Sequence, residues 1–432
     1  MKIIITALLL TGLLPAQEHP SIHQEHQEKY GRNDTPRPAV VLSGLDVLIT
    51  QQAERLKGRN IALVTNNSGI DKQGTPNYRL LMNIKSTRLK VIFSPEHGLF
   101  GEAAAGEQVQ YDSIEELPQV ISLYGQNRKP TAKMLAGVDL IIYDIQDVGA
   151  RYYTYISTLG LILEAGAEQN IPVWVLDRPN PIRGDRIEGP LLDLTYRSFV
   201  GYYPIPVAYG LTVGELARMI VGEGWITGTP QLEIIPMQGW SPNLWYDETG
   251  LPWVKPSPNI PDLETAIIYP GLCLVEGINV NEGRGTYQPF KKIGAPWIEE
   301  KKLAQALNDL QLPGIVFKPI RFTPVGIAGM SDNPKFKNQN CGGVEILLTD
   351  RSVLNSVATG VLVLATIHSL YPEQLEYNRG TLARLWGSDT LPELIDNLKL
   401  GGTISWPWED STSDDYQALV KKYQLYSEPV SK

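Results

Sequence analysis

The sequence predicts an α/β protein: a Rossmann-like parallel sheet in the N-terminal domain, followed by a smaller α+β domain. Short apolar runs alternate with helical stretches over the first half of the chain. Each run is continuously apolar rather than alternating, which is typical of strands buried on both faces of a parallel sheet. From about residue 230 this alternation stops and Pro, Gly and Trp become frequent, so a second kind of domain is expected there.

In the first domain, the elements follow from the order of these runs. A helix is expected over Gly44–Leu56. Strands are expected at Asn60–Thr65, Leu89–Phe93, Val138–Tyr143 and Pro172–Leu176, with helices at Arg79–Ile84, Lys133–Leu135 and Thr158–Glu168. Thr212 followed by Glu215 forms a capping box, which predicts the start of one more helix.

The second domain is expected to mix strands and helices after a long structured loop at Trp240–Pro261. Strands are expected at Thr265–Tyr269, Leu272–Val275, Ile315–Phe322 and Val344–Thr349, and helices at Ile298–Leu310 and Val353–Tyr371. We place the two domains at residues 39–232 and 233–432.

The N-terminus has the features of an export signal. Lys2 is followed by an apolar run from Ile3 to Leu14, and Ala16 suits a cleavage site, so residues 1–16 are expected to be a signal peptide. A buried N-terminal strand or helix is the alternative. Residues 17–38 are polar and are expected to be a linker. These features predict a secreted or periplasmic protein that is not inserted in the membrane after cleavage.

Composition narrows the chemistry. Lys and Arg number 38 against 47 Asp and Glu, a net charge of −9, which argues against nucleic acid as a partner but leaves room for a local cationic pocket. Of the five histidines, only His97 and His368 lie outside the N-terminal stretch. Neither CxxC nor HExxH spacing occurs, so no metal site and no cofactor are expected, and carboxylates are the expected catalytic groups. Cys273 and Cys341 suit either a disulfide or two buried thiols.

Polar side chains follow each predicted strand of the parallel sheet. Because ligands bind outside the carboxyl ends of such strands, we expect these side chains to line one polar pocket. They are Asn66 and Asn67; Glu96 and His97; Asp144, Gln146 and Asp147; and Asp177, Arg178 and Asn180. No GxGxxG follows the first strand and no GxxxxGK[ST] occurs, so nucleotide phosphates are not the expected ligand.

Glu96 is the candidate catalytic residue, between Pro95 and His97-Gly98. Glycoside hydrolysis needs one carboxyl group to protonate the leaving oxygen and a second carboxylate beside it. A helix-capping role for Glu96 is the alternative. Asp144 and Asp147 are candidates for the second group.

Other candidates have structural alternatives of their own. Asp177 suits a turn held by hydrogen bonds to the backbone. Arg151 could clamp a carboxylate or form an internal ion pair, and Tyr155 could pack on a sugar or in the core. Glu276, Glu282 and Arg284 lie in a glycine-rich loop that could reach the pocket or form a domain interface.

Five motifs occur together in one order: SPEHGLFG (94–101), YDIQDVGARYYTY (143–155), DRPNPIRGDRIEGP (177–190), PSPNIP (256–261) and EGINVNEGRGTYQPF (276–290). In these motifs the chain resembles the exo-acting β-N-acetylmuramidases of the NamZ type, over about residues 40–425. The resemblance implies a Rossmann-like domain, a smaller C-terminal domain and a cleft between them. It also implies release of terminal N-acetylmuramic acid from the non-reducing end of peptidoglycan-derived saccharides.

The resemblance makes the glutamate of the EHG motif, here Glu96, the expected general acid. It also makes Asp144, Gln146, Asp147 and Arg151 expected site residues, with Asp144 or Asp147 as the second catalytic group. We expect Arg151 or Arg284 to bind the lactyl carboxylate of muramic acid. Members of the family often carry histidine where this chain has Tyr209. The sequence leaves the stereochemistry and the oligomeric state open.

Two other functions fit the same residues. A secreted saccharide-binding protein would use the pocket without catalysis. A cell-wall esterase or amidase would need a nucleophile such as Ser94, with His97 as its base.

Overall fold

The computed structural model describes residues 40–104, 106–107, 109–111, 116–125, 127–400, 406–408 and 414–427. The expected signal peptide (1–16) and linker (17–38) lie outside the described residues, so both stay predictions.

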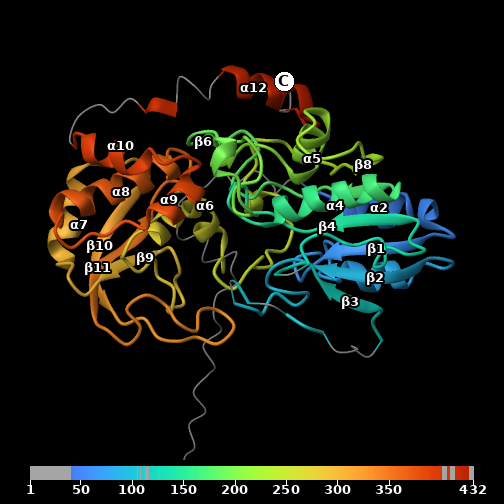
Figure 1. Ribbon diagram of the computed structural model, residues 1–432, viewed down its shortest axis with the longest axis horizontal. Helices are drawn as coiled ribbons and strands as arrows, with labels where there is room; N and C mark the ends of the chain where they lie inside the picture. The colour runs from blue at the N-terminus through green and yellow to red at the C-terminus, as the bar shows by residue number, and fades with distance from the viewer. Residues whose placement is uncertain are drawn as a thin grey trace, which may run out of the picture. The chain divides into compact units, whose positions relative to one another are not determined.

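A six-stranded parallel sheet forms the N-terminal domain, in the order β3-β2-β1-β4-β5-β8 (Figure 1). Its strands are β1 (Asn60–Thr65), β2 (Arg88–Ser94), β3 (Gln119–Ser122), β4 (Leu140–Asp144), β5 (Val173–Leu176) and β8 (Leu232–Ile235). Counted along the chain within this sheet, the strand order is that of a doubly wound Rossmann domain. The predicted Rossmann-like fold is therefore confirmed.

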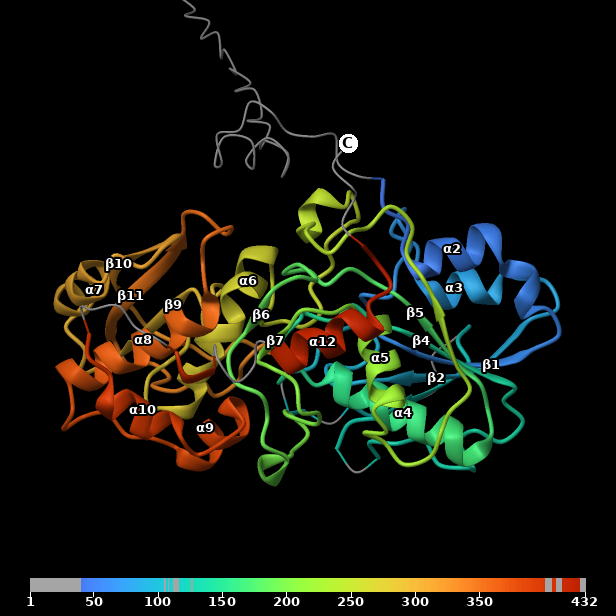
Figure 2. The same cartoon turned by 90° about the horizontal axis from the view of Figure 1, so that it is seen from above.

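Helices cover both faces of the sheet (Figure 2). On one face Ile61 and Leu63 of β1 pack in a core with α2 (Gly44–Gln51) and α3 (Asn77–Met82). On the other face Ala62 and Val64 pack in the core that holds α4 (Tyr155–Gln169) and α5 (Val213–Gly222). Burial on both faces explains why β1 has no polar alternation.

Several local predictions for this domain differ from the structure. The first helix ends at Gln51 and continues only as a short 3₁₀ helix, η1 (Ala53–Leu56). Lys133–Leu135 forms turns rather than a helix. Strands β3 and β8 were not predicted, because each is a short edge strand with residues that are not fully buried. Strand β8 runs from Leu232 to Ile235, so the sheet extends past the predicted domain boundary between residues 232 and 233. The boundary itself stays a prediction.

The C-terminal domain has a three-stranded antiparallel sheet, in the order β10-β11-β9. Its elements are β9 (Lys292–Ala295), α7 (Glu300–Asp309), β10 (Ile315–Phe322), β11 (Cys341–Leu348), α8 (Ser356–Leu370), α9 (Arg379–Trp386) and α10 (Leu391–Asn397). Short elements lie outside these two sheets: β6 (Ile187–Glu188), η2 (Leu194–Tyr196), β7 (Ala208–Tyr209) and η3 (Tyr246–Glu248). This mixture confirms a smaller C-terminal domain of different architecture.

The strands predicted at 265–269 and 272–275 are wrong. The first run lies in helix α6 (Leu263–Leu272), and the second forms the 3₁₀ helix η4 (Cys273–Gly277). Asp262 begins α6, because its side chain accepts a hydrogen bond from the Thr265 N–H at 2.8 Å. Helix α6 packs against α8, where Gly271 and Gly360 lie so close that a Cβ on either would clash with backbone atoms.

The last described helix lies on the N-terminal domain. Helix α12 (Asp414–Tyr423) packs against α5, and the Tyr416 hydroxyl donates a hydrogen bond to the Tyr209 carbonyl at 2.7 Å. Among the described residues no helix has the length and apolar character needed to cross a membrane. Cys273 and Cys341 are buried free thiols, so the disulfide alternative is not the one observed.

Candidate active site

The loop after β2 places Glu96 and His97 at the carboxyl end of the sheet. His97 adopts the left-handed conformation with φ of 69°, and Gly98 follows with φ of 75°. A Cβ on Gly98 would lie 2.6 Å from the Tyr111 hydroxyl, which holds the loop by accepting a hydrogen bond from the Leu99 N–H. A non-glycine residue in this conformation is uncommon and marks a tightly determined loop.

Glu96 is held by donors on both carboxylate oxygens. Oε2 accepts from the Thr154 hydroxyl at 2.8 Å, and Oε1 accepts from the Gly106 N–H at 3.0 Å. Burial, together with the Glu96 charge, raises the pKa of Tyr124 to about 12. The phenol therefore keeps its proton. The two hydrogen bonds to Glu96 fix the direction in which its carboxyl group points.

His97 is a neutral side chain at the same place. Its Nδ1 lies 2.8 Å from the Ala103 carbonyl, which can only accept, so Nδ1 carries the hydrogen. Burial lowers the pKa of His97, an effect opposed by Glu96 and reinforced by Arg284. The neutral ring consequently has a free lone pair on Nε2.

Glu96 and His97 line a pocket of about 130 Å³ whose other walls come from both domains. The remaining lining residues are Tyr152, Tyr153, Thr154, Val200, Ser257, Asn259, Ile260, Tyr269, Cys273, Glu276, Arg284, Phe290 and Leu385. The acidic residues among those that line the pocket are Glu96 and Glu276.

Arg284 is the cation of this pocket. Its Nη2 donates to Glu276 Oε1 at 2.8 Å, and its Nε lies 3.3 Å from Glu282 Oε1. Burial lowers the pKa of Arg284, but Glu276 and Glu282 outweigh this effect and raise it overall. Lys335 Nζ lies 3.0 Å from Glu282 Oε2. Arg284 therefore stays charged beside Glu276.

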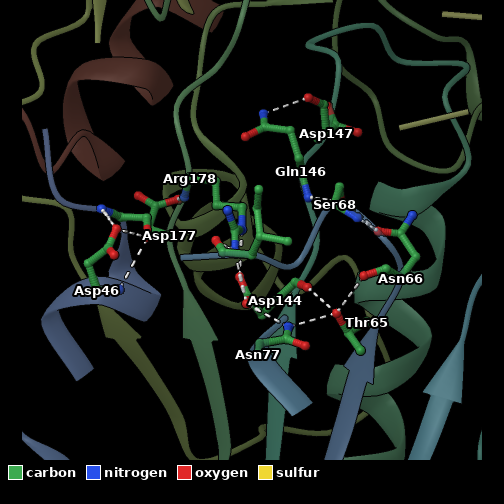
Figure 3. Close-up of polar contacts among 12 residues, drawn as sticks. Asp46, Thr65, Asn66, Ser68, Asn77, Asp144, Gln146, Asp147, Asp177 and Arg178 are labelled. Carbon is green, nitrogen blue, oxygen red and sulfur yellow. Dashed lines mark hydrogen bonds and ion pairs between the residues drawn. The ribbon is translucent and has the colours of Figure 1, made fainter. Parts of the chain in front are cut away.

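The other predicted carboxylates lie outside this pocket. Figure 3 shows Asp144 between Arg178 and Asn77 at the ends of the central strands. Arg178 donates to both oxygens of Asp144, at 2.6 and 2.9 Å, and Asn77 Nδ2 donates to Oδ2 at 2.7 Å. Asp144 is completely buried and Arg178 is 4% exposed. This buried pair fills the crevice where the strand order reverses, in which a ligand would be expected.

Asp147 is also inside the protein. Its Oδ2 accepts from the Tyr209 hydroxyl and from the Gly149 N–H. Burial raises the pKa of Asp147 to about 6, although both hydrogen bonds lower it. Gln146 lies beside it and donates to the Asp147 and Pro179 carbonyls, at 2.8 and 2.7 Å. The contacts of both side chains are thus with the protein itself (Figure 3).

Arg151 holds backbone together instead of binding a carboxylate. Its two terminal nitrogens donate to the carbonyls of Pro190, Ile205, Leu385 and Trp386, between 2.7 and 2.9 Å. It is completely buried. The sequence predicted that Arg151 would clamp a ligand carboxylate or form an internal ion pair. Its carbonyl partners match neither role.

Three predicted site residues, Asn66, Asn67 and Tyr155, support the wall of the pocket. The Asn66 amide donates to the Tyr155 hydroxyl at 2.8 Å, and Tyr155 donates to the Pro256 carbonyl at 2.6 Å. Asn67 likewise donates to the Lys255 carbonyl at 3.0 Å. These contacts attach the segment 255–261, which carries Ser257 and Asn259, to the end of β1. Asn180 has a separate role, since it donates to the Leu211 carbonyl at 3.0 Å.

A larger and more open pocket, about 630 Å³, lies against the loop Gly285–Gln288. Its lining residues include no carboxylate, so it offers no group for acid catalysis. Within the described part of the chain no group of three or more His, Cys, Asp or Glu side chains is placed to hold a metal ion. The smaller pocket around Glu96 is therefore the candidate active site.

Comparison with known proteins adds to this geometry. Residues 61–264 match the family model "Exo-beta-N-acetylmuramidase NamZ, N-terminal", and residues 267–426 match its C-terminal counterpart. The chain belongs to the NamZ family. It is 40% identical over 397 residues to the peptidoglycan β-N-acetylmuramidase NamZ of Bacillus subtilis strain 168, covering 91% of this chain and 94% of that protein.

Two solved structures share the NamZ fold. Both are DUF1343 family proteins from Bacteroides fragilis NCTC 9343. The first has a TM-score of 0.81 and 33% identity, covering 91% of this chain and all (100%) of the other. The second has a TM-score of 0.73 and 29% identity, covering 90% and 99%.

In this NamZ-family chain, the structure brings together only part of the predicted site. Glu96, His97, Glu276 and Arg284 line the pocket. The remaining predicted residues do not line it: Asn66, Asn67, Asp144, Gln146, Asp147, Arg151, Tyr155, Arg178, Asn180 and Glu282. Thr154 and Asn259 line it without having been predicted as site residues, although both lie inside motifs that carried the resemblance.

Proposed function

We propose that this protein is an exo-β-N-acetylmuramidase that releases terminal N-acetylmuramic acid from the non-reducing end of peptidoglycan-derived saccharides. The observation that carries the proposal is a glutamate, Glu96, whose two oxygens are each held by a donor in a pocket that also contains Arg284. Membership of the NamZ family supplies the substrate class.

Glu96 acts as the general acid in this proposal. Its carboxyl proton passes to the glycosidic oxygen as the C1–O bond breaks, and positive charge develops on the sugar ring. Both terminal nitrogens of Arg151 donate to carbonyls, whereas Arg284 lines the pocket, so Arg284 binds the lactyl carboxylate in this proposal. A guanidinium beside an anionic substituent favours muramic acid over sugars that lack the lactyl group.

The structure gives no support to an esterase or amidase that uses Ser94. Ser94 is completely buried and its hydroxyl donates to the Tyr111 hydroxyl at 3.2 Å. His97 uses its Nδ1 on the Ala103 carbonyl. A nucleophile must be hydrogen-bonded to its base and accessible to the substrate, and Ser94 is not exposed.

Turnover of chromogenic glycosides tests this proposal. The purified protein is expected to cleave the β-glycoside of N-acetylmuramic acid much faster than that of N-acetylglucosamine, which lacks the lactyl group. Glu96→Gln should lower turnover by about 10²- to 10⁴-fold, the usual contribution of a general acid. Glu102→Gln, at an exposed glutamate of the same loop, is the matched control and should leave turnover unchanged. Absence of turnover by the wild-type protein would favour a saccharide-binding protein.

We also propose that the protein is exported, because residues 1–16 have the pattern of a signal peptide. Export would place the enzyme where fragments of the cell wall occur. Expression of the full chain should yield an extracytoplasmic protein whose N-terminal sequence starts near residue 17. A protein that keeps Met1 and stays in the cytoplasmic fraction would contradict export.

A further inference from the structure

The pocket contains a second carboxylate that the sequence did not single out for catalysis. Glu96 comes from the N-terminal domain, after β2, and Glu276 comes from η4 in the C-terminal domain. They are the acidic side chains among the residues that line the pocket. Hydrolysis of a glycoside by the usual route needs two carboxyl groups that flank the bond to be broken.

Asp144 and Asp147, the groups expected for the second role, cannot reach a substrate in this arrangement. Asp144 has both oxygens engaged by Arg178, and Asp147 is 4% exposed and bonded to Tyr209 and Gly149. Moving Asp144 into the pocket would leave the buried Arg178 charge without its partner, and moving Asp147 would leave the buried Tyr209 hydroxyl without its acceptor.

Glu276 has the properties that the second role requires. Its side chain is 28% exposed, so the substrate and water can reach it. Only Oε1 is bonded, to Arg284 Nη2 at 2.8 Å; among the described residues no hydrogen-bond partner is found for Oε2. One oxygen is thus fixed while the other remains able to accept a proton.

We infer that Glu276 is the second catalytic carboxylate and acts as the general base that activates water. The inference rests on the proposed function. In the reaction, water forms a bond to C1 as the C1–O bond to the leaving group breaks. Glu96 gives its proton to the leaving oxygen, and Glu276 takes one proton from the water. Exchange with solvent then returns a proton to Glu96 and removes one from Glu276. This step inverts the configuration at C1.

Glu282 provides a matched control, because it also pairs with Arg284 but does not line the pocket. If Glu276 only anchors Arg284, then Glu276→Gln and Glu282→Gln should lower turnover to a similar extent. If Glu276 is the base, Glu276→Gln should lower turnover by about 10²- to 10⁴-fold, well beyond the effect of Glu282→Gln.

Azide rescue separates catalysis from anchoring more sharply. Added azide is a nucleophile that can replace water and needs no base. It should therefore restore the turnover of Glu276→Ala and give the α-glycosyl azide from a β-glycoside substrate. The rate of Glu96→Gln should instead recover with a better leaving group, because such a group needs no protonation. Nuclear magnetic resonance of the first product formed by wild type should show the α anomer.

If the wild-type protein is active, three results would overturn the inference. They are equal effects of Glu276→Gln and Glu282→Gln, no response of Glu276→Ala to azide, and a β anomer as the first product. Circular dichroism of each variant checks that it is folded. A wild-type protein without any turnover would count against the proposed function instead, so the two failures are distinguishable.

Discussion

Tyr209 stands where members of the family often carry histidine, and its contacts show what that difference affects. Its hydroxyl donates to Asp147, and the side chain is 1% exposed. Tyr209 does not line the pocket around Glu96. The difference therefore concerns the stability of a buried carboxylate rather than a direct contact with the substrate.

The contact between Tyr209 and Asp147 leads to a prediction about how stability depends on pH. Burial raises the pKa of Asp147 from 3.8 to about 6, so between these values the folded state binds more protons than the unfolded state. The free energy of unfolding contributed by Asp147 therefore falls as pH rises through this range. Tyr209→Phe removes a donor to the carboxylate and raises the pKa further. We expect this variant to lose about 1–3 kcal/mol of stability at pH 8 and less at pH 4.5.

Urea unfolding at the two pH values measures this effect. Asp147→Asn is the matched background, because there the cost of Tyr209→Phe should no longer depend on pH. An equal cost at pH 4.5 and pH 8 in the wild-type background would show that the hydroxyl acts on something other than the charge of Asp147.

At the scale of elements, the sequence predicted the parallel sheet well because its strands are buried on both faces. The runs at Asn60–Thr65 and Leu89–Phe93 lie on β1 and β2. The same reasoning failed at Thr265–Tyr269, where a helix is buried on all sides. Residues 265–272 of α6 are all buried, so no polar face marks the helical period. A short apolar run of this kind does not distinguish a strand from a buried helix.

For the candidate site, the structure shows where the predicted side chains lie. The polar residues at the strand ends do lie near one another, as parallel strands require. What the sequence could not show is which of them neutralise each other. Arg178 follows β5 and pairs with Asp144 at the end of β4, so both are withdrawn from any ligand. Glu276 lies in a loop for which the sequence predicts an approach either to a ligand or to the other domain, and the sequence does not show which side chain of that loop enters the pocket.

At the scale of the molecule, residues 414–427 pack on the N-terminal domain. Arg218 of α5 donates to the Tyr423 carbonyl at 2.8 Å. The Tyr426 hydroxyl donates to Asp177 at 2.6 Å, and the Leu425 N–H donates to Glu215 at 2.8 Å. Because α10 belongs to the C-terminal domain, the chain between α10 and α12 links the two domains a second time.

This second link predicts that the two domains unfold together. The full chain should show a single transition in calorimetry, and removal of residues 414–432 should separate it into two, with the N-terminal domain unfolding first because α5 loses its cover. In the full chain, Tyr416→Ala should cost about 3–5 kcal/mol, as for other large buried side chains. Tyr287→Ala, at a tyrosine that is 81% exposed, is the control and should change stability by about 0.5 kcal/mol or less. If the truncated chain still unfolds in one transition at the original temperature, α12 contributes nothing to the coupling, and the interface between the domains alone must account for it.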